Sequence, residues 1–345
     1  MGIPGRTVRG RKCPSAFSRV TPLSFTTIVR PLLLATITLL AACTAQPPPS
    51  TSAQTAPALS TNAKTAPFAL PDTEQREIVS KALGRTYQVF VSLPRDYREN
   101  TSHRYPVLFI TDTTYAFPLV RSIARMVGDK GNGLEDFILV GLSYAKDDTS
   151  QYSRRRDYTP TPRGARTATT SDMPGQPVVH GEAEAYRLFI RDEVFPLVAL
   201  HYRADMDRRI FAGHSYGALL GTHMLLTEPS MFEKYILSSA SLWYDQRVMF
   251  EREQDYAREH DDLPAQVFLS IGGYETVKPG SADPRYNTEV DMLGDMQRFE
   301  GRLKAHDYPG LRVQSTVIAD EDHLSVYPAA ITRGLKWALP PVQGS

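Results

Sequence analysis

The sequence predicts an α/β fold built on a mostly parallel sheet with helices on both faces. Three observations lead to this prediction. The 345 residues are 41% hydrophobic and 22% charged, which is ordinary for a globular protein. Short apolar runs occur at intervals along the chain, as is typical of strands buried on both faces. Helical patterns separate these runs, and the alternation of strand and helix favours a parallel sheet.

Taken in chain order, the predicted elements begin with an antiparallel strand at 87–93, where apolar and polar residues alternate. Later strands are expected at 107–110, 137–140, 209–212, 235–238, 267–271 and 311–318. Helices are expected at 182–200, 218–226, 288–305 and 329–339. The polar, Arg-rich stretch 146–181 is expected to form a loop over the functional site.

The N-terminus predicts export. Residues 1–42 contain six basic residues and no acidic one, and they end in an apolar stretch too short to span a bilayer, which needs about 20 residues. Leu40-Ala-Ala-Cys43 resembles the lipobox of bacterial lipoproteins, which implies cleavage before Cys43 and acylation of its thiol. An ordinary secretory signal is the alternative. The lipobox resemblance implies a lipid anchor at the periplasmic or outer-membrane face of the cell envelope.

The segment after the signal predicts a tether. Residues 43–67 are mostly Pro, Ser, Thr, Ala and Gln, which cannot bury enough apolar surface to fold. Residues 68–345 are expected to form the folded domain. The cysteines are Cys13 and Cys43, so the exported chain would have no disulfide.

Charge and motifs exclude several classes of function. The chain has 39 basic and 38 acidic residues, so without residues 1–42 it is acidic by about five charges. Such a chain would repel a phosphate backbone, and nucleic acid is not an expected partner. No His-Glu-x-x-His motif or surviving cysteine pair occurs, and we predict no metal and no cofactor.

A nucleophile motif stands between a predicted strand and a predicted helix. Gly213-His-Ser-Tyr-Gly217 matches G-x-S-x-G, follows the strand that ends at Ala212 and precedes the helix at Ala218. In this pattern a serine sits on a sharp strand-to-helix turn, and the glycines allow strand and helix to approach closely. The sequence therefore predicts an α/β-hydrolase fold with Ser215 as nucleophile.

A serine nucleophile needs a base, and His323 fits that role best. It lies after the last predicted strand and before the last helix, and the chain order in this fold is serine, acid, histidine. His306 is interpreted as a solvated residue. The side chain of His214 is expected to point away from Ser215.

The acid is predicted from the same chain order. Glu275 follows the strand 267–271 and a Gly-Gly turn, which is the expected place for the residue that orients the base. Asp283, in the same loop, is the alternative. The acidic residues 320–322 are interpreted as solvated loop charges.

An oxyanion hole needs two backbone N–H groups aimed at the developing negative charge. The amide of Tyr216, directly after the nucleophile, is expected to supply one. The loop after the strand 107–111 is expected to supply the other, from Thr113 or Thr114.

Several motifs together resemble the putative-esterase family of α/β hydrolases, over roughly residues 77–337. They are Tyr105-Pro-Val-Leu-Phe-Ile-Thr-Asp112, Arg156-Asp-Tyr-Thr-Pro160, Gly213-His-Ser-Tyr-Gly217, Ser239-Ala-Ser-Leu-Trp-Tyr244 and Asp322-His323. The resemblance implies a Ser–His pair at residues 215 and 323 and an oxyanion amide near Thr114. It also implies hydrolysis of esters, in a branch that includes esterases of trilactone siderophores such as enterobactin. Thr113 departs from the family, which usually has Gly there, and some members work as a Ser–His dyad without an acid.

Residues that could select the substrate lie beside or within two of these motifs. Arg154, Arg155 and Arg156 could grip an anionic substrate, or they could form a solvated charged loop. Trp243 could line an acyl or aryl pocket, or it could belong to the core.

The predicted function is that of a serine esterase for a small-molecule ester, with siderophore trilactones favoured. A small-acyl carboxylesterase or acyltransferase is the first alternative, and a surface-binding lipoprotein without chemistry is the second. The membrane is expected as a partner through the lipid anchor.

Overall fold

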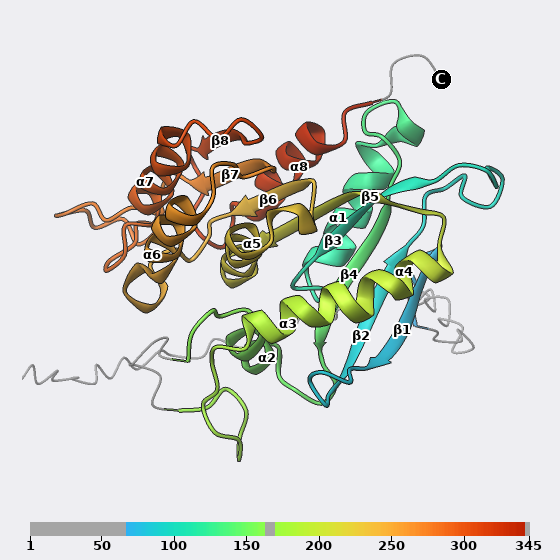
Figure 1. Cartoon of the computed structure of the whole chain (residues 1–345), viewed down its shortest axis with the longest axis horizontal. Helices are drawn as coiled ribbons and strands as arrows, with labels where there is room; N and C mark the ends of the chain where they lie inside the picture. The colour runs from blue at the N-terminus through green and yellow to red at the C-terminus, as the bar shows by residue number, and fades with distance from the viewer. Residues whose placement is uncertain (1–66, 163–169, 342–345) are drawn as a thin grey trace, which may run out of the picture. The chain divides into compact units, whose positions relative to one another are not determined.

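Eight strands form one sheet in the part of the chain that the computed structural model describes, residues 67–162 and 170–341 (Figure 1). Their order across the sheet is β1-β2-β4-β3-β5-β6-β7-β8. The bounds are β1 Thr73–Val79, β2 Thr86–Ser92, β3 Tyr105–Ile110, β4 Ile138–Ala145, β5 Ala204–His214, β6 Lys234–Ser238, β7 Gln266–Gly272 and β8 Arg312–Ile318.

The sheet is mostly parallel. β2 pairs antiparallel with β1 and with β4, and every other neighbouring pair, from β3–β4 to β7–β8, is parallel. Parallel neighbours place their carboxyl ends at one edge, where α/β folds carry their sites. The predicted fold class is therefore confirmed.

Helices cover both faces of the sheet. Their bounds are α1 Ala116–Met126, α2 Ser150–Asp157, α3 Ala183–Phe189, α4 Phe195–His201, α5 Tyr216–Thr227, α6 Tyr244–Glu259, α7 Met292–Ala305 and α8 Tyr327–Ala338. Along β3, Val107 and Phe109 pack into the core shared with α3 to α7, whereas Leu108 and Ile110 pack into the core shared with α1 and α8. Because side chains alternate along a strand, a strand covered on both faces must be apolar throughout, and all six residues of β3 are buried.

Three elements were not predicted from the sequence, and one predicted loop is partly helical. The additional elements are β1, α1 and α6, and the loop predicted at 146–181 contains α2. The helix predicted at 182–200 is formed by α3, a π-helical turn over Ile190–Val194, and α4. In Figure 1 these segments run as one long helix across the sheet.

The predicted export signal, Cys43 and nearly all of the predicted tether lie outside the described residues. Among the helices of residues 67–162 and 170–341, none is both long and apolar enough to cross a bilayer.

Candidate active site

Ser215 occupies the turn between the end of β5 and the start of α5. Its backbone has φ 57° and ψ −118°, a conformation that a residue other than glycine rarely adopts. The flanking glycines make this turn possible: a Cβ on Gly213 would lie 2.4 Å from the carbonyl carbon of Gly217, and one on Gly217 would lie 2.2 Å from Thr111 Oγ1. Strand, helix and neighbouring loop therefore meet at closer range than side chains would allow.

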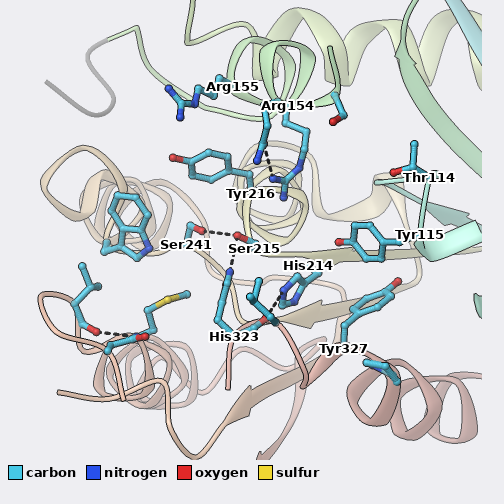
Figure 2. Close-up of a pocket in the computed structure, with 18 of the residues that line it drawn as sticks. Thr114, Tyr115, Arg154, Arg155, His214, Ser215, Tyr216, Ser241, His323 and Tyr327 are labelled. Carbon is cyan, nitrogen blue, oxygen red and sulfur yellow. Dashed lines mark hydrogen bonds between the residues drawn. The ribbon is translucent and has the colours of Figure 1, made fainter. Parts of the chain in front are cut away.

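His323 and Glu275 form a chain of contacts that ends on Ser215. The ring nitrogen Nε2 of His323 is 3.0 Å from Ser215 Oγ, and Nδ1 is 2.6 Å from Glu275 Oε2. His323 lies between β8 and α8, and Glu275 follows β7, as the chain order predicts. A carboxylate only accepts hydrogen bonds, so the proton of the imidazole is on Nδ1. Nε2 is therefore free to accept a hydrogen bond from the Ser215 hydroxyl. Figure 2 shows His323 reaching up to Ser215.

Glu275 is held in place from its other side. Its side chain is fully buried, and Oε1 accepts hydrogen bonds from Ser239 Oγ at 2.6 Å and from the amide of Gly272 at 2.8 Å. A buried carboxylate needs such donors to compensate for its lost hydration. The oxygen that faces His323 is therefore fixed in direction.

The alternative acid lies elsewhere. Asp283 makes an ion pair with Arg285 at 2.6 Å and contacts neither His323 nor Ser215 among the described residues. Asp322 accepts from the amides of Leu324 and Ser325, so it holds the turn that carries His323. Of the two acids considered from sequence, the structure brings only Glu275 to the histidine.

His214 supports the turn that carries His323 and makes no hydrogen bond to Ser215 among the described residues. Its Nε2 is 3.0 Å from the carbonyl oxygen of His323, and the two rings lie 4.8 Å apart. A carbonyl only accepts, so Nε2 carries the proton, and Nδ1 can accept from Ser238 Oγ at 3.3 Å. Burial, reinforced by the nearby His323 and Arg154, lowers the pKa of His214 to about 3. The ring is therefore neutral and braces the main chain of His323.

The two residues predicted to form the oxyanion hole both line the pocket that contains Ser215. Tyr216 is the first residue of α5, where the N–H has no partner within the helix. Thr114 follows β3, two residues after Asp112, whose φ is 58°. Among the described residues, no group accepts a hydrogen bond from the amide N–H of Tyr216 or of Thr114. Their role toward an oxyanion stays a prediction.

The pocket has a volume of about 940 Å³ and its walls come from several loops and helices. α2 contributes Arg154 and Arg155, and the segment after β6 contributes Ser241 and Trp243. Further lining residues are Thr114, Tyr115, Leu119, Tyr144, Asn287, Thr288, Glu289, Val290, Met292, Leu324, Tyr327 and Pro328. Polar and apolar side chains are mixed around Ser215 (Figure 2).

The three consecutive arginines do not act together. Arg154 Nε lies 2.7 Å from Asp112 Oδ1, and its guanidinium carbon is 5.6 Å from the centre of the Tyr216 ring. Burial raises the pKa of Asp112, and Arg154 opposes this rise. Arg155 Nε lies 2.9 Å from Asp172 Oδ2. Both arginines face the pocket, each beside an acid.

Arg156 is a correction to the sequence prediction. It does not line the pocket, only 5% of its side chain is exposed, and it pairs with Asp157 and Asp148, both at 2.8 Å. The reason is helical geometry, because successive residues of α2 point about 100° apart and three in a row cannot share one face. Arg156 is therefore part of a buried ion network.

Sequence reasoning also missed residues of the pocket. Ser241, the tyrosines 115, 144 and 327, and residues 287–290 line it but were not selected. Ser241 lies within a motif that carries the family resemblance, but nothing in that motif marks its hydroxyl as part of the pocket. No local signal marks the tyrosines or residues 287–290, which reach the pocket through the tertiary fold.

Comparison with known proteins agrees with this geometry. Residues 80–279 match the model of a protein family described as "Putative esterase". Among curated proteins, the chain is 26% identical over 278 residues to the ferri-bacillibactin esterase BesA of Bacillus subtilis, covering 79% of this chain and 92% of that protein. It is 26% identical over 284 residues to the siderophore triacetylfusarinine C esterase of Aspergillus fumigatus, covering 78% and 94%.

A solved structure shares the fold. The BES protein from Bacillus cereus superposes with a TM-score of 0.65 at 23% identity, over 81% of this chain and 98% of that one. The family match spans more than half of the chain. The chain therefore belongs to the "Putative esterase" family and is a carboxylic ester hydrolase with an α/β-hydrolase fold.

Proposed function

We propose that the protein hydrolyses the lactone esters of a siderophore through an acyl-enzyme formed on Ser215. The observation that carries this proposal is the contact chain from Glu275 through His323 to Ser215, with distances of 2.6 and 3.0 Å, in the wall of a pocket. Two further points support it. Both curated relatives described above are siderophore esterases. The pocket volume is near the upper end of the range for small-molecule sites, about 300–1,000 Å³, and suits a bulky substrate.

Each residue then has a defined role in two half-reactions. His323 accepts the hydroxyl proton of Ser215 as Oγ attacks the ester carbonyl, and Glu275 stabilises the imidazolium. The amides of Tyr216 and Thr114 donate to the oxygen that becomes negative. His323 then protonates the departing alcohol, and water attacks the acyl-enzyme in the same way to release the acid.

The side chains around the nucleophile select the substrate. Arg154 and Arg155 present guanidinium groups, which pair with oxyanions such as catecholate oxygens. Each is already paired with an acid, so an anionic substrate must compete with Asp112 or Asp172. The indole of Trp243 offers a flat surface on which an aryl group can stack.

A substrate panel tests this proposal. Purified protein is incubated with enterobactin, triacetylfusarinine C and a nitrophenyl ester, and the products are identified by liquid chromatography and mass spectrometry. We expect linear products from at least one siderophore, and none with the Ser215→Ala variant. Intact siderophores beside a hydrolysed nitrophenyl ester would indicate a small-acyl carboxylesterase instead. Acylated alcohols among the products would indicate an acyltransferase.

We also propose that the protein is exported and anchored to the cell envelope by lipid on Cys43. The support is the sequence Leu40-Ala-Ala-Cys43 after a basic and then apolar N-terminus. Cell fractionation tests it: the full chain is expected in the membrane fraction and the Cys43→Ser variant in the soluble fraction, with equal turnover. Mass analysis of the native protein should find acyl chains on a polypeptide that begins at Cys43. An unmodified N-terminus elsewhere would contradict the anchor.

A further inference from the structure

The short segment 239–241, after β6, contacts both Glu275 and Ser215. Ser239, with φ 47°, turns the chain sharply after Ser238, and its hydroxyl donates to Glu275 at 2.6 Å. Two residues later, the amide of Ser241 donates to the carbonyl oxygen of Ser215 at 3.3 Å. The segment is therefore tied to the acid and to the main chain of the nucleophile.

The hydroxyl of Ser241 also reaches the reacting oxygen. Ser241 Oγ lies 3.3 Å from Ser215 Oγ, on the pocket wall, and the residue is 1% exposed (Figure 2). Within the described residues, Ser215 Oγ is the only side-chain partner of this hydroxyl. The Ser215 proton points to His323 Nε2, which is an acceptor because Nδ1 donates to Glu275. Ser241 is therefore the donor of the pair, and Ser215 Oγ accepts.

From this geometry we infer that Ser241 is a further catalytic residue, whose hydroxyl stabilises Ser215 Oγ as the leaving group when the acyl-enzyme is hydrolysed. The inference rests on the proposed acyl-enzyme mechanism. In this step His323 takes a proton from water, the water oxygen bonds to the acyl carbon, and the bond from that carbon to Ser215 Oγ breaks. Its electron pair stays on Oγ, which receives the proton back from His323. The Ser241 O–H donates to Oγ while this negative charge develops.

The hydrogen bond from Ser241 is expected to affect the rates of acylation and deacylation differently. Before acylation, Oγ belongs to a hydroxyl and already accepts the Ser241 hydrogen bond. In the acyl-enzyme, Oγ belongs to an ester and is a poorer acceptor, because its lone pair is shared with the carbonyl group. Only an interaction that strengthens between ground state and transition state accelerates a step. The hydrogen bond gains more in deacylation, so losing it slows deacylation more.

Rapid mixing with p-nitrophenyl acetate separates the two half-reactions. The burst of nitrophenolate reports acylation, and the following steady rate reports deacylation. For Ser241→Ala we expect the steady rate to fall on the order of tenfold, the usual effect of losing one hydrogen bond, while the burst rate changes by less than about threefold. Acetylated protein should accumulate in the intact-mass spectrum.

Ser270→Ala is the matched control, because Ser270 is a buried serine on neighbouring β7 whose hydroxyl has no partner among the described residues. Its two rates should equal those of the parent, and thermal unfolding should confirm that both variants are folded. Equal slowing of burst and steady rate in Ser241→Ala, or no slowing of either, would overturn the inference. A parent protein without acyl-enzyme turnover, or a Ser215→Ala variant that retains it, would instead overturn the proposed mechanism.

Discussion

Glu275 and His323 lie 48 residues apart in the chain, and the carboxylate oxygen Oε2 of Glu275 is 2.6 Å from Nδ1 of His323. β7 and β8 are parallel neighbours, so the loops that follow them leave the sheet at the same edge and can meet. The contact selects one imidazole tautomer and points Nε2 at Ser215.

The first prediction concerns this acid. Glu275→Ala should lower kcat for a nitrophenyl ester on the order of 10⁴-fold, because the imidazole loses its orientation and the stabilisation of its positive charge. Asp283→Ala should change kcat by less than about threefold, since Asp283 pairs with Arg285 away from His323. Steady-state kinetics measure both. A silent Glu275→Ala beside a severe Asp283→Ala would reverse the assignment.

The second prediction concerns Ser215 and His323, the proposed nucleophile and base. Ser215→Ala and His323→Ala should each lower kcat on the order of 10⁶-fold, and the double variant should be little worse than either. The two side chains act as one unit, with 3.0 Å between Oγ and Nε2. Labelling by a fluorophosphonate probe should be lost in the single variants. Losses that multiply in the double variant would mean that the residues act independently.

The third prediction concerns substrate charge. Arg155→Gln should raise KM for a catecholate trilactone about tenfold and leave KM for a neutral nitrophenyl ester unchanged. Arg155 is the better probe because its partner Asp172 is part-exposed, whereas removing Arg154 would leave the buried Asp112 without its cation. The effect should shrink in high salt, which screens exposed charges. Equal losses on both substrates would indicate a change of pocket shape instead.

The fourth prediction concerns the neighbouring arginine. Arg156→Ala should lower the free energy of unfolding by about 3 kcal/mol, because the buried carboxylate of Asp157 loses its nearest cation and keeps only Arg85, at 3.7 Å, and the Tyr87 hydroxyl. Urea denaturation followed by circular dichroism measures this. Arg155→Gln is the matched comparison and should unfold close to the parent. An unchanged urea midpoint for Arg156→Ala would show that the buried ion network does not stabilise the fold.

The fifth prediction concerns pH. Burial lowers the pKa of His214 to about 3 from the ordinary value of 6.5, so between these values the unfolded chain binds a proton that the folded chain refuses. The free energy of unfolding must then decrease as pH falls through this window, by up to about 1.4 kcal/mol per pH unit from this group. Urea midpoints at pH 7, 6, 5 and 4 should fall less steeply for His214→Asn than for the parent. Parallel curves would show that His214 does not contribute.

The parts of the fold that could be predicted from sequence are buried segments that consist mainly of apolar residues. β3, β4, β6, β7 and the second half of β5 are mostly apolar because both faces are covered, and α5 follows a recognisable motif. β1 was missed because it is a polar strand at the edge of the sheet, Thr-Glu-Gln-Arg-Glu-Ile-Val, with no buried residue. α6 was missed because most of its surface is charged.

In the candidate site, too, some residues could be predicted from sequence and others could not. Ser215, Glu275 and His323 could be placed because each lies within the first few residues after a strand that the sequence predicts. The pocket walls could not, since a side chain on a helix faces the pocket only if the helix is rotated correctly. This is why Arg154 and Arg155 reach the pocket and Arg156 does not. The alternative of a surface-binding protein without chemistry was wrong, because the family is one of esterases.

The pocket walls contributed by α2 and by residues 287–290 have a consequence for how such a protein can change. Both segments lie outside the strands, whereas Ser215, Glu275 and His323, the proposed catalytic residues, lie shortly after strands of the packed sheet. Insertions and exchanges are tolerated in surface segments far better than in strands. The proposed catalytic residues and these two parts of the pocket wall therefore come from different segments of the chain. Exchanging residues 287–290 and the pocket-facing residues of α2 between family members, with the buried Arg156 and Asp157 kept, should therefore transfer substrate preference and leave Ser215, His323 and Glu275 in place.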